Sequence, residues 1–207
     1  MLIYIILGYI SGSILYAPIW AKILHTGSIT EKSKDKNPGT ANAFMYGGVL
    51  CGVLTLVCEL LKGYIPVRLC IMNNPGCVRD NVLFALVLCA PVIGHIFPIL
   101  NGFHGGKGIA ATFGCLLGLV PMFEPVLIMA ATFIFFSVIL KISPNIYRTI
   151  AAYITALPLM TAFSLKLGVI SICIGFTIIT IAVGYKLFKS SEEREKLTLS
   201  ILWRQIH

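Results

Sequence analysis

A glycine-flanked lysine is the most chemically suggestive feature of the sequence. Gly105, Gly106 and Gly108 surround Lys107, and an apolar helix is expected to begin near Ile109. Glycines let several backbone N–H groups point at one oxyanion, and the positive end of the following helix strengthens the attraction. The spacing differs from the G-x-x-x-x-G-K-[ST] pattern of P-loops, so it predicts an anion site without predicting a nucleotide.

His95 lies shortly before this segment, within the sequence Gly-His-Ile-Phe-Pro of residues 94–98. An imidazole beside an anion site can act as a general base or donate a hydrogen bond to phosphate, although a lone histidine is often structural. We predict His95 and Lys107 as catalytic residues. The predicted substrate-binding residues of this segment are Gly105, Gly106, Gly108 and Thr112. No His/Asp/Glu spacing indicates a metal, so no metal or cofactor is expected.

A second polar segment runs over residues 34–44 and contains the turn Asn-Pro-Gly at 37–39. Its lysines and asparagine amides offer several donors and few competing carboxylates, which favours an anion such as phosphate. A solvated turn that anchors the topology is the plainer alternative. The substrate-binding residues predicted here are Lys34, Asn37, Gly39 and Asn42.

A third polar feature lies inside an apolar run. Glu59 and Lys62 are three residues apart, so they share a helix face and can pair. Ionisable groups within a membrane span are costly and usually functional, although a structural ion pair between helices is the alternative. Gly63 would let a ligand or a neighbouring backbone come close. We predict Lys62 and Gly63 as substrate-binding residues.

The composition places these segments in an integral membrane protein. Of the 207 residues, 57% are hydrophobic and 12% are charged, whereas soluble domains are about 25% charged. Apolar runs cover about 2–24, 47–72, 81–100, 109–140, 149–165 and 167–188. A span needs about 20 residues, so the fourth run is too long for one helix and is expected to break near Pro121 and Glu124.

The expected fold is therefore an all-α bundle of seven transmembrane helices. The fourth and sixth spans are short, so they are candidates for broken or re-entrant segments. Residues 1–188 form a single membrane domain, and 189–207 form a charged amphipathic tail that is compatible with an interfacial helix. Small residues four apart, at Gly8/Gly12, Gly48/Gly52 and Gly114/Gly118, are expected to bring helix backbones together.

The charge distribution predicts the orientation. The net charge is +8, and an arrangement with the N-terminus outside leaves Arg79 and Lys166 in the outer loops and most other basic residues inside. The C-terminus and the loops that carry Asn37 and Lys107 then face the cytoplasm. The lipid bilayer is an expected partner. Nucleic acid is not, because the basic residues are scattered among apolar spans.

In order and spacing, three segments resemble the bacterial acyl-phosphate:glycerol-3-phosphate acyltransferase family. They are Asn-Pro-Gly…Asn at 37–42, Leu-Leu-Lys-Gly at 60–63, and Gly-His-x-Phe-Pro…Gly-Gly-Lys-Gly…Ala-Thr at 94–112. The resemblance implies an enzyme of the bacterial inner membrane with its active site at the cytoplasmic face. It would move a fatty acyl group from acyl phosphate to the sn-1 hydroxyl of glycerol 3-phosphate, giving lysophosphatidic acid and phosphate for phospholipid synthesis, without metal, CoA or acyl carrier protein.

On this resemblance, Asn37, Asn42 and the glycines around Lys107 hold phosphate groups. Lys62 neutralises one phosphate, and His95 orients or deprotonates the acceptor. The enzyme hypothesis requires that the asparagine turn and the glycine-flanked lysine meet around one oxyanion pocket.

Several positions depart from the family pattern. Asp35 and Lys36 replace a serine and a glycine, Met45 replaces an arginine, and the family's C-terminal His-Arg…Asn segment is not recognisable in 186–207. Fewer phosphate ligands leave open a paralogue that acts on another phosphorylated acceptor. A small anion or lipid transporter is the alternative from another class, motivated by the charged pair in the second span.

Overall fold

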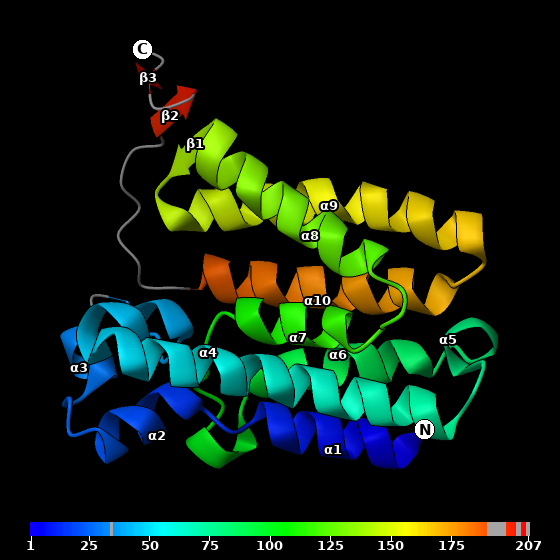
Figure 1. Ribbon diagram of the computed structural model, residues 1–207, viewed down its shortest axis with the longest axis horizontal. Helices are drawn as coiled ribbons and strands as arrows, with labels where there is room; N and C mark the ends of the chain where they lie inside the picture. The colour runs from blue at the N-terminus through cyan, green and yellow to red at the C-terminus, as the bar shows by residue number, and fades with distance from the viewer. Residues whose placement is uncertain (34, 190–197, 202–203, 206–207) are drawn as a thin grey trace.

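The computed structural model describes residues 1–33, 35–189, 198–201 and 204–205, and it is mostly helical (Figure 1). The α-helices are α1 (Leu2–Gly12), α2 (Tyr16–Ile23), α3 (Ile29–Lys32), α4 (Thr40–Asn73), α5 (Cys77–Asp80), α6 (Phe84–Ile96), α7 (Ile109–Leu117), α8 (Glu124–Ile134), α9 (Asn145–Leu167) and α10 (Ile170–Phe188). A 3₁₀ turn, η1 (Ile99–Asn101), and a π-helical turn, η2 (Phe135–Ile139), extend α6 and α8.

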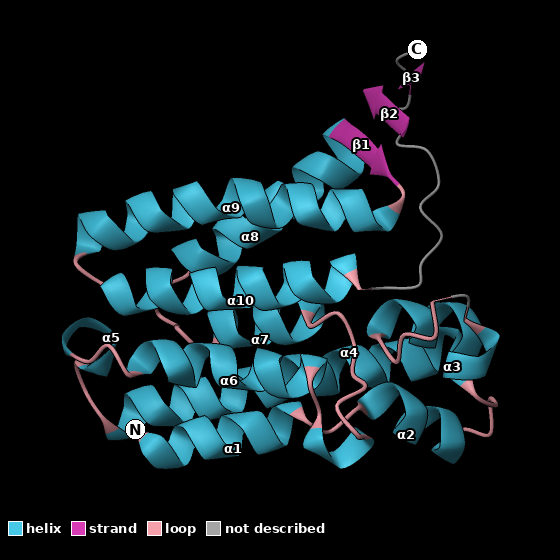
Figure 2. Ribbon diagram, turned by 180° about the vertical axis from the view of Figure 1, so that it is seen from behind, coloured by secondary structure: helices cyan, strands magenta, loops and turns pink. Residues whose placement is uncertain are grey.

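The long helices lie side by side and run in alternating directions, as both views of the ribbon show (Figures 1 and 2). Helix α6 packs against α1 and α10, α4 packs against α7, and α9 packs against α8 and α10. Because the directions alternate, the loops that follow α2, α6, η2 and α10 gather at one end of the bundle. The N-terminus and the α4–α6, α7–α8 and α9–α10 connections lie at the other end. Arg79 in α5 and Lys166 in the last turn of α9 therefore lie at the end opposite to the Asn37 and Lys107 loops, and the side of the membrane that each end faces stays a prediction.

Many large apolar side chains point outward from the bundle, as expected for helices that face lipid. Among the described residues, four helices are long and apolar enough to cross a membrane: α4, α6 with η1, α9 and α10. Helices α1 and α2 together would make a fifth span, bent by 45°. Helix α7 has nine residues and is shorter than a span. Helical segments lie over the ranges of the seven predicted spans, but among the described residues four or five of these segments have spanning length.

Three helix boundaries differ from the prediction. Helix α4 begins at Thr40 rather than near 47, because a short helical stretch joins the predicted span through the kink at Gly48. The first apolar run is not one straight helix, because the chain leaves α1 after Gly12 and starts α2 at Tyr16. The sixth span is not short, because α9 has 23 residues and begins at Asn145 rather than near 149. Polar residues extend it, since Thr149 Oγ1 donates to the Asn145 carbonyl over 2.9 Å. The length of an apolar run does not include this first, polar turn of α9, so the run alone gave too short a helix.

The all-α prediction is wrong in one region. Strands β1 (Leu140–Ser143), β2 (Thr198–Ile201) and β3 (Arg204–Gln205) form an antiparallel sheet in the order β1-β2-β3. The tail residues 198–201 are therefore a strand rather than part of an interfacial helix. Their Thr-Leu-Ser-Ile sequence alternates polar and apolar residues, which is the period of a strand, and β1 provides the edge with which it pairs. Of the predicted tail, residues 190–197, 202–203 and 206–207 lie outside the described residues.

Close helix contacts rest on glycine at two of the three predicted pairs. A Cβ on Gly12 would lie 2.1 Å from the Pro91 carbonyl oxygen, and one on Gly114 would lie 2.2 Å from the Leu60 carbonyl oxygen. The expectation fails at Gly48, where an added Cβ would meet no other part of the protein within 4 Å and the φ is 83°. There the glycine permits a kink in α4 instead of a close contact.

Candidate active site

The asparagine turn and the glycine-flanked lysine meet at one end of the bundle. Lys107 Nζ lies 3.1 Å from Asp35 Oδ2, with the two side chains only 15% and 12% exposed. Asn42 Nδ2 donates to Asp35 Oδ1 over 2.7 Å and to the Asn37 carbonyl over 2.8 Å. The backbone N–H of Asn37 also donates to Asp35 Oδ1 over 3.2 Å. These bonds fold residues 35–42 into a compact loop whose carboxylate faces Lys107.

This contact lies at a cavity of about 770 Å³ between three parts of the chain. The loop 35–38, the segment 97–107 and the end of α10 supply most of its described lining, which includes Asp35, Asn37, Lys107 and Lys186. Lys36 and Lys189 add two more cations, and Asp35 is the single carboxylate among the described lining residues. The surplus of positive charge makes the cavity suitable for anionic groups.

The ionisation of Asp35 fits this setting. Burial raises the pKa of the Asp35 carboxyl, but the hydrogen bond from Asn42 and the charge of Lys107 outweigh burial and hold the pKa below its ordinary value. The carboxylate is therefore charged across the neutral range.

The glycines before Lys107 are required for packing on His95. The Gly106 amide donates to the His95 carbonyl over 3.1 Å. A Cβ on Gly105 would lie 1.9 Å from the same carbonyl oxygen, and a Cβ on Gly106 would lie 2.1 Å from His95 Nε2. One of the N–H groups that the sequence assigned to an anion is thus used within the protein.

A buried charged cluster lies behind this loop. Glu59 Oε2 is 2.8 Å from Lys62 Nζ and 2.8 Å from His95 Nδ1, and Lys62 Nζ is 2.8 Å from His95 Nδ1. All three side chains are at most 5% exposed. Lys62 Nζ also donates to the carbonyl oxygens of Gly12 and Ile14, over 3.0 and 2.7 Å.

The last two bonds explain how the break between α1 and α2 is tolerated. A helix that ends inside an apolar bundle leaves carbonyl oxygens without helical partners, and these are costly in lipid unless the protein supplies donors. The Lys62 ammonium is that donor, and Glu59 balances its charge. The cluster therefore joins α1, α4 and α6 and supports the carbonyl that holds Gly106.

The predicted site residues divide into three groups. Asn37, Gly105 and Lys107 line the cavity. Asn42 and Gly39 stabilise the 35–42 loop without lining the cavity. Asn42 donates hydrogen bonds within the loop, and Gly39 is the residue that precedes α4. Lys34 lies outside the described residues.

The remaining predicted residues are buried away from the described lining. Lys62 and His95 belong to the charged cluster, and Gly63 packs on α7, where its Cβ would lie 2.5 Å from the Ala111 carbonyl oxygen. Gly108 has a φ of 81° and starts α7. Thr112 Oγ1 donates to the Gly108 carbonyl and accepts from the Tyr153 hydroxyl, each over 2.9 Å.

Lys186 in the last turn of α10 and Lys189 directly after the helix were not predicted as site residues. Lys186 and Lys189 line the cavity together with Tyr185. The sequence could have indicated them, because the two lysines are three residues apart at the end of the last apolar run, on the side of the membrane predicted for Lys107. Asp35 was noted only as a departure from a family pattern, yet it is the partner of Lys107.

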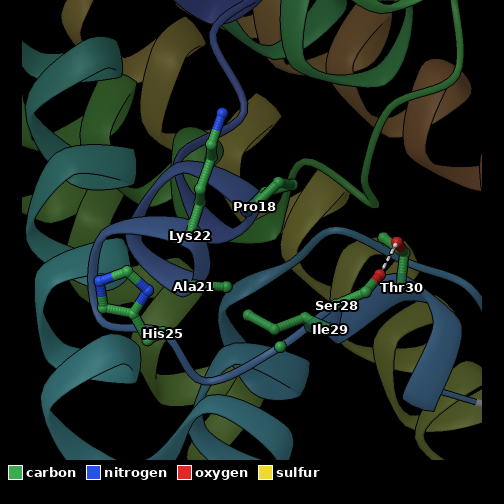
Figure 3. A pocket seen from close by; sticks show the side chains of 8 residues that line it. Pro18, Ala21, Lys22, His25, Ser28, Ile29 and Thr30 are labelled. Atoms are coloured by element: carbon green, nitrogen blue, oxygen red, sulfur yellow. Dashed lines mark hydrogen bonds between the residues drawn. The ribbon is translucent and has the colours of Figure 1, made fainter.

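A second, more open hollow of about 500 Å³ lies between α2 and α3 (Figure 3). Its lining includes Lys22 and His25, and it shares Pro18 and Thr30 with the larger cavity. Figure 3 shows the Lys22 and His25 side chains pointing in different directions. They do not form a convergent site. Across the described part of the chain, no group of three His, Cys, Asp or Glu residues could hold a metal ion.

Comparison with known proteins relates the whole membrane region to one family. The family model for glycerol-3-phosphate acyltransferase matches residues 2–195. The glycerol-3-phosphate acyltransferase of Bordetella petrii is 35% identical over 153 residues, which are 73% of this chain and 67% of that protein. That of Albidiferax ferrireducens is 34% identical over 117 residues, which are 56% of this chain and about half of that protein, 52%.

Solved structures show the same fold. The crystal structure of PlsY, an integral membrane glycerol 3-phosphate acyltransferase, in its lysophosphatidic acid form has a TM-score of 0.71 at 25% identity. Its glycerol 3-phosphate form has a TM-score of 0.73 at 24% identity. In each comparison 89% of this chain and 86% of that chain are covered. The bundle described above is therefore the fold of an integral membrane protein.

Proposed function

The chain belongs to the glycerol-3-phosphate acyltransferase family, and from this we propose that it transfers a fatty acyl group from acyl phosphate to the sn-1 hydroxyl of glycerol 3-phosphate. The products are lysophosphatidic acid and inorganic phosphate. The observation that carries the proposal is one cavity that is lined by Lys107 and Asn37 and also by lysines at and just after the end of α10, Lys186 and Lys189.

The charges of the cavity suit the two substrates. Acyl phosphate and glycerol 3-phosphate each bring a phosphate group, and both groups must lie within a few ångströms of the reacting carbonyl. Lys107 stands on one wall, and Lys186 and Lys189 stand at the end of α10 on another. Ammonium groups on two walls can hold two phosphates and reduce the repulsion between them.

The cavity also offers apolar surface for the acyl chain. Phe97 and Phe103 line it, and Ile99 and Leu100 in the adjoining turn are 55% and 67% exposed. A turn with exposed apolar side chains at the end of a bundle is suited to the membrane interface. The fatty chain would lie in lipid along this turn while its phosphate end enters the basic cavity.

In the reaction, the sn-1 oxygen of the acceptor attacks the acyl carbon, and the bond from that carbon to the phosphate oxygen breaks. The acceptor's hydroxyl proton passes to an oxygen of the departing phosphate, so atoms and charges balance without a redox partner. Lys107 stabilises negative charge that develops on the leaving phosphate. The protein's main contribution is to place the two substrates in line.

Lys62 and His95 receive positioning roles in this scheme. Their side chains are buried in contact with Glu59, and His95 holds the glycine loop through its carbonyl oxygen. This arrangement favours proton transfer within the substrates over deprotonation by His95. It also favours a structural role for the charged pair that motivated the transporter alternative.

We place the protein in the bacterial inner membrane with the cavity at the cytoplasmic face. The loops that border the cavity share one end of the bundle with most of the basic residues, which is the positive-inside pattern.

A donor comparison tests the proposal. Purified protein in detergent is given labelled glycerol 3-phosphate with palmitoyl phosphate, palmitoyl-CoA or palmitoyl acyl carrier protein. Labelled 1-acyl lysophosphatidate should form with palmitoyl phosphate alone, together with an equal amount of phosphate. Product with a thioester donor, or acylation at the sn-2 position, would contradict the proposal. Uptake of glycerol 3-phosphate into liposomes without turnover would instead favour a transporter.

A further inference from the structure

Asp35 is the one negative charge among the described residues that line a basic cavity, and it lies directly against Lys107. Its two oxygens have different partners. Oδ1 accepts hydrogen bonds from Asn42 Nδ2 and the Asn37 amide, whereas Oδ2 faces Lys107 Nζ at 3.1 Å. The first pair of bonds fixes the carboxylate in place whether or not Lys107 contacts it.

A phosphate that approaches Lys107 therefore meets a charged carboxylate that does not move away. Lys107 would share its charge between the two anions, and the phosphate would be repelled by Asp35 at close range. The ammonium groups of Lys186 and Lys189 have no carboxylate beside them within the described lining of the cavity. The cavity thus has two basic sides. On one side Lys107 is paired with Asp35, and on the other side no carboxylate among the described lining residues accompanies Lys186 and Lys189.

We infer that Asp35 is an affinity-setting residue that weakens the binding of phosphate groups at Lys107, and that it thereby promotes release of inorganic phosphate after transfer. The inference rests on the proposed function for the identity of the phosphate ligand, and it adds a residue and a role to that function. Weak binding is useful at this position, because a leaving phosphate held tightly by Lys107 would inhibit the next turnover.

Asp35→Asn is the direct test. The asparagine keeps an oxygen that accepts from Asn42 and the Asn37 amide, and it removes the negative charge. Binding of inorganic phosphate is measured by calorimetry on the purified protein in detergent, with no acyl donor present. The dissociation constant should fall by about three- to tenfold relative to the natural protein, which is the range expected for removing one partly screened charge. An unchanged or larger dissociation constant in the folded variant would overturn the inference.

Two further variants make the result specific. Glu31→Gln removes the same charge from the exposed face of α3, outside the described lining of the cavity, and should leave phosphate affinity unchanged within about twofold. An equal gain there would show a general charge effect and overturn the inference. In a Lys107→Ala background, Asp35→Asn should tighten binding by a smaller factor than in the natural protein, because only the direct repulsion is then relieved. An equal gain in both backgrounds would show that Asp35 does not act through Lys107.

Folding and function are controlled separately. The thermal midpoint of each ligand-free variant reports folding, and Asp35→Ser, which keeps a small hydrogen-bond acceptor, replaces Asp35→Asn if that variant does not fold. Because phosphate binding is measured without turnover, the inference can hold or fail whichever donor the protein uses. A failed acyl-transfer assay with intact phosphate binding would contradict only the proposed function.

Discussion

The ring of His95 packs directly against Gly106, whose amide N–H donates a hydrogen bond to the His95 carbonyl oxygen over 3.1 Å. This contact ties the loop that carries Lys107 to the end of α6. Behind it, the same histidine contacts Glu59 and Lys62. The position of the cavity's central lysine is therefore set by groups buried in the bundle.

Gly106→Ala tests this support. Its Cβ would lie 2.1 Å from His95 Nε2, so the loop must move and displace Lys107. We expect a loss of about 1–3 kcal/mol of stability and a fall in turnover of about 100-fold, because a shift near 1 Å in a positioned group has that effect. Gly184→Ala is the matched control, since nothing lies within 4 Å of its Cβ. Equal activity of the two variants would show that the loop contact is unimportant.

Lys62→Met tests the buried cluster. The substitution leaves the Glu59 carboxylate without its lysine and removes the donor to the carbonyl oxygens of Gly12 and Ile14. We expect a loss of about 3–5 kcal/mol in denaturant titrations in detergent, the usual cost of removing one partner of a buried pair. Lys166→Met changes the same charge at an exposed site and should be nearly neutral. A Lys62→Met protein as stable as that control would refute the account of the α1–α2 break.

Lys186→Ala tests the second cationic wall. Loss of one charge-assisted contact, worth about 1.5 kcal/mol, should raise the KM for glycerol 3-phosphate or for acyl phosphate by about tenfold. Initial rates at varied concentrations of each substrate identify which phosphate this wall holds. Lys22→Ala removes a lysine that lines the neighbouring hollow, and it should change neither KM by more than about twofold (Figure 3). Unaltered KM values in Lys186→Ala would show that Lys186 does not contact either substrate phosphate.

Acid should weaken the Asp35–Lys107 contact. Because the pKa of Asp35 is held below its ordinary value in the folded protein, the carboxylate contributes stability above the unfolded pKa, near 4, and this contribution is lost as pH falls through the folded pKa. The difference in thermal midpoint between the natural protein and Asp35→Asn should therefore shrink between about pH 5 and pH 3. A difference that grows on acidification would have the wrong sign.

Sequence patterns were sufficient for the features that depend on local chemistry. The polar loops after the first and third apolar runs, the glycines at α1–α6 and α4–α7 contacts, and the pairing of Glu59 with Lys62 are all present in the structure. Each follows from residue type and spacing along one helix or loop.

Features that depend on distant contacts were not predictable in this way. The spacing predicted that Lys62 pairs with Glu59, but it could not indicate that Lys62 also donates to carbonyl oxygens freed by the break between α1 and α2. The glycine at 48 looked like a packing residue, yet its φ of 83° permits a kink. Residues 198–201 alternate as a strand does, but the pattern within them could not specify β1, 55 or more residues earlier, as the strand with which they pair.

The central claim is that Lys107 lies in the active site for transfer from acyl phosphate. The most direct measurement is the single-turnover rate of labelled lysophosphatidate formation from palmitoyl phosphate and glycerol 3-phosphate, with Lys107→Ala compared with Lys166→Ala. We predict a loss of at least about 100-fold in a Lys107→Ala protein that still unfolds cooperatively on heating, and a normal rate in Lys166→Ala. A folded Lys107→Ala protein that transfers the acyl group at the natural rate would contradict it.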